Sequence, residues 1–291
     1  MLKTVWLTEN KDLSKGCAIL LGGFDGLHVG HRRLLARAKE SGLPVGVMTI
    51  FGGKGEQGLF TFPERARIFK ESGADFVFKL PFSEIKSLSV TQFLCLLRDE
   101  FSPKLFVCGE DFRFGFCAKG TPKDIVEWGQ VRVDVLSLVE IDGEKVSSRT
   151  VKHHLLQGDI EKVNALLGHT YFVLGEVVKD RGVGKTLGFP TANIVYAEDK
   201  CPMKEGVYET RVRIDGRTYK GITNFGARPT FGNETKRLET HLDGFEGDLY
   251  GREIKVEFVR FLREIQKFDD VDALKNQLKN DVVTIRGNEN D

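Results

Sequence analysis

The sequence contains no long apolar run, although 41% of its 291 residues are hydrophobic. A transmembrane helix needs roughly 20 consecutive apolar residues, so none is predicted. Residues 1–16 also lack the apolar core of a secretory signal peptide. These absences favour a cytoplasmic protein that has no membrane partner.

Cysteine is scarce, and its spacing matches no known site. The five cysteines include no C-x-x-C pair, and their number is odd. This usage favours free thiols in a reducing compartment over a disulfide framework. A strong charge of either sign is missing too, because 43 basic residues are balanced by 42 acidic ones. No nucleic-acid partner is therefore predicted, and the balance favours recognition of a small charged ligand.

The first half of the chain alternates apolar runs with helix-like stretches. Strand patterns occupy 17–23, 43–51, 74–82 and 104–109, and helical patterns occupy 31–42, 62–73 and 89–101. This alternation is typical of a parallel sheet flanked by helices. Ligands of such sheets bind beyond the carboxyl ends of the strands, near helix amino termini.

The second half has a different period. Short alternating strands are expected at 171–178, 206–214, 217–226, 237–242 and 252–262, followed by a helix over 270–282. Asp215-Gly216 falls between two of these strands and is a strong hairpin signal. The pattern predicts a closed antiparallel barrel with a final helix.

Two domains therefore account for the chain. We expect an α/β parallel-sheet domain over 1–158, a helical linker over 159–168 and an antiparallel β-barrel domain over 169–291.

The stretch GGFDGLHVGH, residues 22–31, joins the first strand to the first helix. Its glycines let the backbone approach a ligand, and the following helix offers unpaired N–H groups to an anion. His28 and His31 lie three residues apart and share one helix face, with Gly30 leaving space beside them. Such a set suits the charge of a triphosphate. The alternative is that Asp25 and Gly26 form a tight turn and the histidines only flank it.

A second glycine-rich stretch, DRGVGKTLGFPTANI, occupies residues 180–194. It is not a Walker A loop, because Lys179 stands where that motif needs glycine, and its glycines are spaced too widely for a dinucleotide fingerprint. It is either a phosphate-binding loop or an ordinary bulge between strands. Thr191 and Asn193 lie two apart on a strand, so they share one face and offer oxygen ligands suited to Mg²⁺.

RLETHL, residues 237–242, has polar and apolar positions in alternation. Glu239 and His241 share one face of this strand, and Leu238, Thr240 and Leu242 take the other. If the apolar side packs inward, Glu239 on its own is a surface carboxylate.

Several of these stretches resemble one family. GGFDGLHVGH resembles the G-x-F-D-G-x-H-x-G-H signature of the nucleotidylyltransferase superfamily, in the form found in prokaryotic FAD synthetases, the bifunctional riboflavin kinase/FMN adenylyltransferases. GEDFRFG (109–115) and VSSRTVK (146–152) look like two further segments of that family. The PTAN stretch is similar to the riboflavin kinase signature G-[RK]-x-L-G-[FY]-P-T-A-N-[IL]. The resemblance spans roughly residues 17–283.

For the first half, the resemblance implies a nucleotidylyltransferase-type α/β domain. This domain would join FMN to the AMP part of ATP and release pyrophosphate. The resemblance implies that His28 and His31 stabilise the ATP phosphates and that Asp111 lies at the nucleotide or flavin site, where we count it as a flavin-binding residue. The other residues that it places at the phosphates are Gly22, Phe24, Asp25, Gly30, Ser147, Ser148 and Lys152.

For the second half, the resemblance implies a barrel that phosphorylates riboflavin with ATP to give FMN and ADP. Glu239 would be the general base for the ribityl 5′-hydroxyl. Thr191 and Asn193 would hold Mg²⁺ with ATP. Gly182, Gly184 and Lys185 would cover the phosphates, and Asn224, Arg263 and Phe268 would contact the flavin.

The first half departs from the family pattern at three places. Lys152 replaces the usual arginine, Arg149 replaces a serine or threonine, and FGGKGEQG (51–58) replaces a segment with P-H-P. These departures motivate a second hypothesis, a riboflavin kinase with a weak or inactive adenylyltransferase domain. A third hypothesis, a non-catalytic flavin-binding regulatory module, predicts flavin binding without ATP consumption. Glu239 and the PTAN stretch argue against it.

Overall fold

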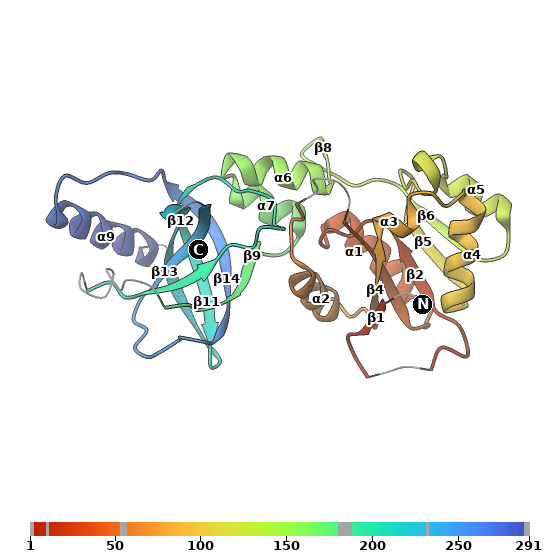
Figure 1. Cartoon of the computed structure of the whole chain (residues 1–291), viewed down its shortest axis with the longest axis horizontal. Helices are drawn as coiled ribbons and strands as arrows, with labels where there is room; N and C mark the ends of the chain where they lie inside the picture. Colours follow the sequence, from red (N-terminus) through yellow and green to blue (C-terminus); the bar gives the residue numbers. More distant parts are fainter. Residues whose placement is uncertain (1–2, 10–11, 53–56, 180–187, 231–232, 288–291) are drawn as a thin grey trace. The chain divides into compact units, whose positions relative to one another are not determined.

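A computed structural model describes residues 3–9, 12–52, 57–179, 188–230 and 233–287 (Figure 1). The chain divides into two compact units, Met1–Thr150 and Val151–Asp291. The division falls before the expected boundary at residue 158. The helical segment expected as a linker therefore belongs to the second unit.

The first unit is built on a six-stranded sheet. In spatial order its strands are β1 (Lys3–Trp6), β4 (Phe76–Pro81), β3 (Val45–Phe51), β2 (Ala18–Leu21), β5 (Leu105–Gly109) and β6 (Arg132–Leu136). β1 pairs antiparallel with β4, and the other neighbours are parallel. The chain runs from β2 to β3 and β4 on one side and then returns to β5 and β6 on the other. A crevice is expected at such a switch of direction.

Helices cover both faces of this sheet (Figure 1). They are α1 (Val29–Lys39), α2 (Phe62–Glu71), α3 (Phe82–Ile85), α4 (Val90–Phe101) and α5 (Pro122–Trp128). Three smaller elements complete the unit: the 3₁₀ turn η1 (Phe116–Ala118) and the two strands of a hairpin, β7 (Glu140–Ile141) and β8 (Glu144–Lys145). The central strand β2 is buried on both faces. Ile19 and Leu21 belong to the same hydrophobic cluster as Leu94 of α4, and Ala18 and Leu20 are buried on the other side.

The second unit begins with two helices, α6 (Ser148–Gln157, which starts in the first unit) and α7 (Ile160–Leu167). Gly158 separates them at a φ of +79°. An antiparallel sheet follows in the order β10 (Thr191–Val195), β13 (Asn233–Leu242), β12 (Arg217–Thr230), β11 (Gly206–Ile214), β14 (Glu253–Arg263) and β9 (Phe172–Glu176). An isolated bridge between Val178 and Asn193 brings the two edges together, so the sheet is a nearly closed barrel.

The two faces of the barrel strands have separate roles. Inside, the hydroxyls of Thr210, Thr223 and Thr240 form a buried chain with 2.9 Å between neighbouring oxygens. Outside, the final helix α9 (Val271–Arg286) packs Val282 and Ile285 against the strands.

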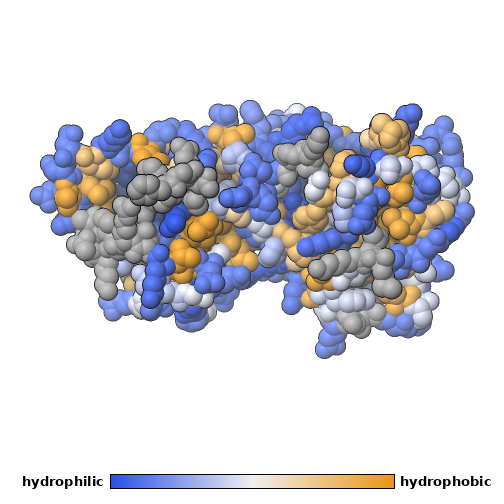
Figure 2. Space-filling view, in the orientation of Figure 1, coloured by the Kyte–Doolittle hydropathy of each residue, from blue (hydrophilic) through white to orange (hydrophobic). Residues whose placement is uncertain are grey.

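The predicted fold class is confirmed in both units, including the hairpin at Asp215-Gly216, where both residues have positive φ. The sequence patterns missed β1, α5, β6 and the β7–β8 hairpin. No helix in the described ranges is long and apolar enough to cross a bilayer. Polar and charged side chains cover most of the face in Figure 2, with the hydrophobic areas small and separate.

Candidate functional sites in the two units

A cavity of about 340 Å³ lies in the first unit where β2, β3 and β5 end. The amino terminus of α1 meets it there, because His28 caps that helix and lines the cavity. This is the edge at which parallel sheets bind ligands. Among the predicted site residues, the cavity brings together Gly22, His28, Gly30, His31, Asp111, Ser147 and Ser148.

The imidazoles of His28 and His31 stack in this cavity, with ring centroids 3.5 Å apart and planes 16° apart. Nδ1 of His28 accepts from the backbone N–H of His31 at 3.2 Å, so the side chain caps α1. Nδ1 of His31 lies 3.0 Å from the carbonyl oxygen of Gly26. A Cβ atom at Gly30 would lie 3.2 Å from Nδ1 of His28, which explains why glycine stands there.

Burial controls the charge of both rings. It lowers the pKa of His28 to about 4, although the nearby Asp111 carboxylate acts in the opposite direction. Burial and the neighbouring ring of His28 together hold the pKa of His31 well below its ordinary value. Both imidazoles are therefore neutral near pH 7, and they act on a ligand through hydrogen bonds.

Three residues that the sequence assigned to the phosphates do not line the cavity. Phe24 is buried, has a φ of +39° and packs its ring 4.4 Å from that of His31. Lys152 lies on α6, in the second compact unit. The third is Asp25, whose carboxylate is bound within the protein.

Asp25 belongs to a buried polar network. Its Oδ1 lies 2.6 Å from Nη2 of Arg65 and accepts from the backbone N–H of Leu59 at 2.9 Å. Arg65 also donates to the Phe60 carbonyl and to Thr49 Oγ1. A carboxylate repels phosphate, and this one is already neutralised. Asp25 therefore ties the histidine turn to the start of α2.

Other charged groups at the cavity come from the loop after β5 and the β7–β8 hairpin. Asp111 pairs with Lys145 over 2.7 Å. Arg113, which the sequence analysis missed, also lines the cavity. The sequence could have indicated Arg113, because it is the one cationic residue in the GEDFRFG motif. Ser147 caps α6, because its Oγ accepts from the backbone N–H of Thr150 at 3.2 Å.

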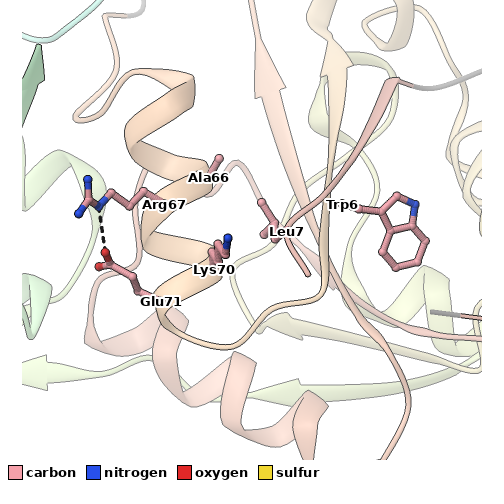
Figure 3. Close-up of a pocket in the computed structure, with 6 residues that line it drawn as sticks. All are labelled: Trp6, Leu7, Ala66, Arg67, Lys70 and Glu71. Carbon is pink, nitrogen blue, oxygen red and sulfur yellow. Dashed lines mark hydrogen bonds and ion pairs between the residues drawn. The ribbon is translucent and has the colours of Figure 1, made fainter. Parts of the chain in front are cut away.

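A second hollow of the first unit, about 730 Å³, lies between the end of β1 and α2 (Figure 3). Its lining residues are Trp6, Leu7, Ala66, Arg67, Lys70 and Glu71. Arg67 and Glu71 pair with each other over 2.9 Å. This hollow is larger than the histidine cavity but contains no predicted site residue, so volume does not locate the site here.

In the second unit, the predicted kinase residues form one row across the barrel. Asn193 of β10 is paired with Glu239 of β13, which is paired with Asn224 of β12. The row continues through Val207 of β11 to Arg263 of β14. Directly paired residues point to the same side of a sheet, so these side chains share the outer face. Glu239 is half-buried on that face.

Asn193 has an unused ligand atom. The side chain is buried, and its Oδ1 has no hydrogen-bond partner among the described residues. Its Nδ2 points at the backbone oxygen and Oγ1 of Thr191, 3.3 and 3.4 Å away. A buried carbonyl oxygen without a partner is costly, and a cation ligand would satisfy it. The two oxygens of Thr191 and Asn193 fit Mg²⁺, which keeps several waters and takes few protein ligands.

Neighbouring side chains hold this row in place. His241 Nδ1 donates to the carbonyl of Pro190 over 3.0 Å and so attaches the segment before β10 to β13. Arg263 forms a two-nitrogen contact with buried Asp281 of α9, with 2.7 Å between Nη2 and Oδ2. The sequence analysis missed Asp281. Its position inside the apolar stripe of the final helix could have indicated a buried partner for this carboxylate. Phe268 lies half-buried between β14 and α9. Gly182, Gly184 and Lys185 lie outside the described residues.

The two units together define a fused pair of nucleotide-dependent transferases. The FAD synthetase family model matches residues 10–150, and the riboflavin kinase family model matches residues 167–288. A bifunctional riboflavin kinase/FMN adenylyltransferase from Pseudomonas fluorescens is 34% identical over 94% of this chain and 93% of its own. The enzymes of that name from Bacillus subtilis (strain 168) and Escherichia coli (strain K12) are 30% and 34% identical, and each match covers at least 92% of both chains.

This chain therefore belongs to the bifunctional riboflavin kinase/FMN adenylyltransferase family. The carboxyl-terminal unit phosphorylates riboflavin to FMN, and the amino-terminal unit adenylylates FMN to FAD with release of pyrophosphate. Riboflavin, FMN and ATP are its substrates. A solved structure from Streptococcus pneumoniae, described as a macrolide-efflux protein, is 29% identical and covers 97% of both chains with a TM-score of 0.85.

Proposed function

We propose that the histidine-lined cavity is the adenylylation centre of the first unit. The observation that carries this assignment is the convergence of His28, His31, Ser147 and Ser148 in one cavity at the switch point of the sheet. The phosphate oxygen of FMN attacks the α-phosphorus of ATP, the bond from that phosphorus to the β-phosphate oxygen breaks, and pyrophosphate leaves. No protein nucleophile is needed, so the protein positions the reactants and stabilises charge.

Within that cavity the residues divide by location. The imidazoles and the amino terminus of α1 face the phosphates, with Gly22 and Gly30 allowing close approach. Asp111 and Arg113, on the loop after β5, face the flavin side. We assign Asp25 and Phe24 to positioning of the turn, because ion pairing and burial occupy their side chains.

For the kinase centre we propose the row on the outer face of the barrel. Glu239 accepts the proton of the riboflavin 5′-hydroxyl as that oxygen attacks the γ-phosphorus, and ADP leaves. Thr191 and Asn193 would hold Mg²⁺, which offsets phosphate charge when bound. Asn224 lies beside Glu239 in register and would contact the flavin, with Arg263 and Phe268 at the far end of the row. Gly182, Gly184 and Lys185 would cover the phosphates.

We also propose a cytoplasmic location. Burial raises the pKa of the Cys17 and Cys108 thiols to about 12 each, so both are protonated and unreactive. All five cysteines are free, which suits a reducing compartment.

Chromatography of the products tests these assignments. Purified protein with riboflavin, ATP and Mg²⁺ should form FMN first and FAD second. His28→Ala combined with His31→Ala should stop the pathway at FMN. Accumulation of FMN alone by the wild type, with excess ATP, would instead favour a kinase with a weak adenylyltransferase unit.

A further inference from the structure

The two cavity histidines have different tautomers, and their hydrogen bonds determine which. The backbone N–H of His31 donates to Nδ1 of His28, so the proton of neutral His28 is on Nε2. Nδ1 of His31 faces the carbonyl oxygen of Gly26, which can only accept. Neutral His31 therefore carries its proton on Nδ1 and a lone pair on Nε2. A phosphate oxygen, which is an acceptor, would meet a donor on His28 and a lone pair on His31.

The stacked pair can hold one positive charge more easily than two, because the ring centroids are only 3.5 Å apart. Protonating His28 at Nδ1 would oppose the backbone N–H of His31 and remove the cap of α1. Protonating His31 at Nε2 adds a donor and keeps its bond to Gly26. The hydrogen bonds thus direct a bound proton to His31.

The other charged groups at the cavity act on this choice as well. Asp111 favours charge on His28, but it is paired with Lys145 over 2.7 Å. Arg113 is the other charged side chain that lines the cavity. Burial lowers the pKa of both rings, and the ring of His28 lowers the pKa of His31 further, which by itself favours His28 for a first proton. The hydrogen bonds oppose that preference, and a bound triphosphate adds negative charge that raises the pKa of both rings.

We propose that His31 takes up one proton from solvent when ATP binds in this cavity and donates it through Nε2 to a phosphate oxygen, while His28 donates as a neutral imidazole. The inference rests on the proposed adenylylation function of the cavity. The proton stays on His31 while the AMP group is transferred to FMN, and it returns to solvent when pyrophosphate leaves. The net reaction is therefore unchanged. His31 then supplies charge, and His28 supplies a neutral hydrogen bond and the helix cap.

Nitrogen NMR of the full-length protein with ¹⁵N-labelled histidine tests this directly. The probe is an ATP analogue with a methylene group between the α- and β-phosphorus, added with Mg²⁺ at about pH 8. His31→Gln and His28→Gln assign the two Nε2 signals. We expect Nε2 of His31 to change from unprotonated to protonated on binding, and Nε2 of His28 to be protonated throughout.

Kinetics provide an independent readout. With one proton taken up, kcat/KM for ATP in FAD formation should fall about tenfold per pH unit from about pH 7 to 8. His31→Gln keeps an N–H near Nε2 but cannot titrate, so its profile should be flat at a lower level. His28→Gln should keep the slope, as should the control His153→Gln, because His153 is exposed on α6.

Four results would overturn the proposal. An unprotonated Nε2 of His31 with the analogue bound would do so, and so would a slope that disappears only in His28→Gln. If the analogue perturbs neither ring although the protein still phosphorylates riboflavin, the proposed function of the cavity fails along with the inference. An intact cavity function with no proton uptake appears instead as FAD formation with a flat wild-type profile.

Discussion

The two sites differ in how completely the protein satisfies its own polar atoms. Around the histidine cavity, Nδ1 of both imidazoles and the Asp25 carboxylate already have protein partners. On the barrel, Oδ1 of Asn193 is buried without a partner in the described part of the chain. The first site is therefore organised by internal contacts, and the second leaves an oxygen for a ligand from outside.

This contrast has a chemical reason. Adenylylation needs an attacking phosphate and a triphosphate held in line, which rigid donors at a helix terminus achieve. Phosphorylation of a hydroxyl also needs a base and a charge-neutralising cation beside it. Asn193 and Glu239 are direct partners across β10 and β13, so the proposed metal ligand and the proposed base are fixed relative to each other by backbone pairing.

Breaking the internal contacts of the first site should give the largest effect. Arg65→Met leaves the Asp25 carboxylate without its buried partner and should lower the free energy of unfolding of the first unit by about 3–5 kcal/mol. Urea unfolding followed by tryptophan fluorescence measures it, because Trp6 and Trp128 both lie in the first unit. The control Lys123→Met removes an exposed pair to Glu127 and should change it by less than about 1 kcal/mol. If both variants lowered the free energy of unfolding equally, the ion pair between Asp25 and Arg65 would contribute no more than an exposed one.

Acid should weaken the first unit through His28. Its pKa in the folded protein, about 4, is below that of the unfolded chain, so the unfolded chain binds more protons as the pH falls. The first unit should lose about 3 kcal/mol from this group between about pH 6.5 and 4. His28→Gln should remove this part of the pH dependence, as seen in unfolding curves at several pH values. If the free energy of unfolding of His28→Gln depended on pH as steeply as that of the wild type, the claim that His28 is buried and neutral would be wrong.

At the barrel, removing the unused oxygen should have a smaller and more selective effect. Asn193→Ala should raise the Mg²⁺ concentration needed for half-maximal riboflavin phosphorylation by about tenfold or more. Adenylylation of supplied FMN should not change. The control Asn280→Ala, on the exposed part of α9, should leave both steps unaltered. An unchanged Mg²⁺ requirement in Asn193→Ala would exclude this residue as a metal ligand.

Local patterns were enough to predict much of this organisation. Hydrophobic periods of different length separated the α/β unit from the barrel, and the spacing of His28 and His31 was enough to place them on one face. Glu239 and Asn193 were placed on one side of their strands by the period of two.

What could not be predicted depends on contacts between distant segments. Asp25 pairs with Arg65, 40 positions away, and nothing near GGFDGLHVGH indicates that partner. The register that sets Asn193 beside Glu239 depends on two strands far apart in sequence. The same holds for Arg263 and Asp281, which meet only once α9 folds back onto β14.

The central claim is that each unit carries one complete and separate site. It is tested most directly by mixing two variants, Glu239→Gln and the double variant His28→Ala with His31→Ala, and supplying riboflavin, ATP and Mg²⁺. We predict that neither protein alone forms FAD, since the first makes no FMN and the second stops at FMN, and that the mixture does. FAD from either variant alone, or none from the mixture, would contradict the account.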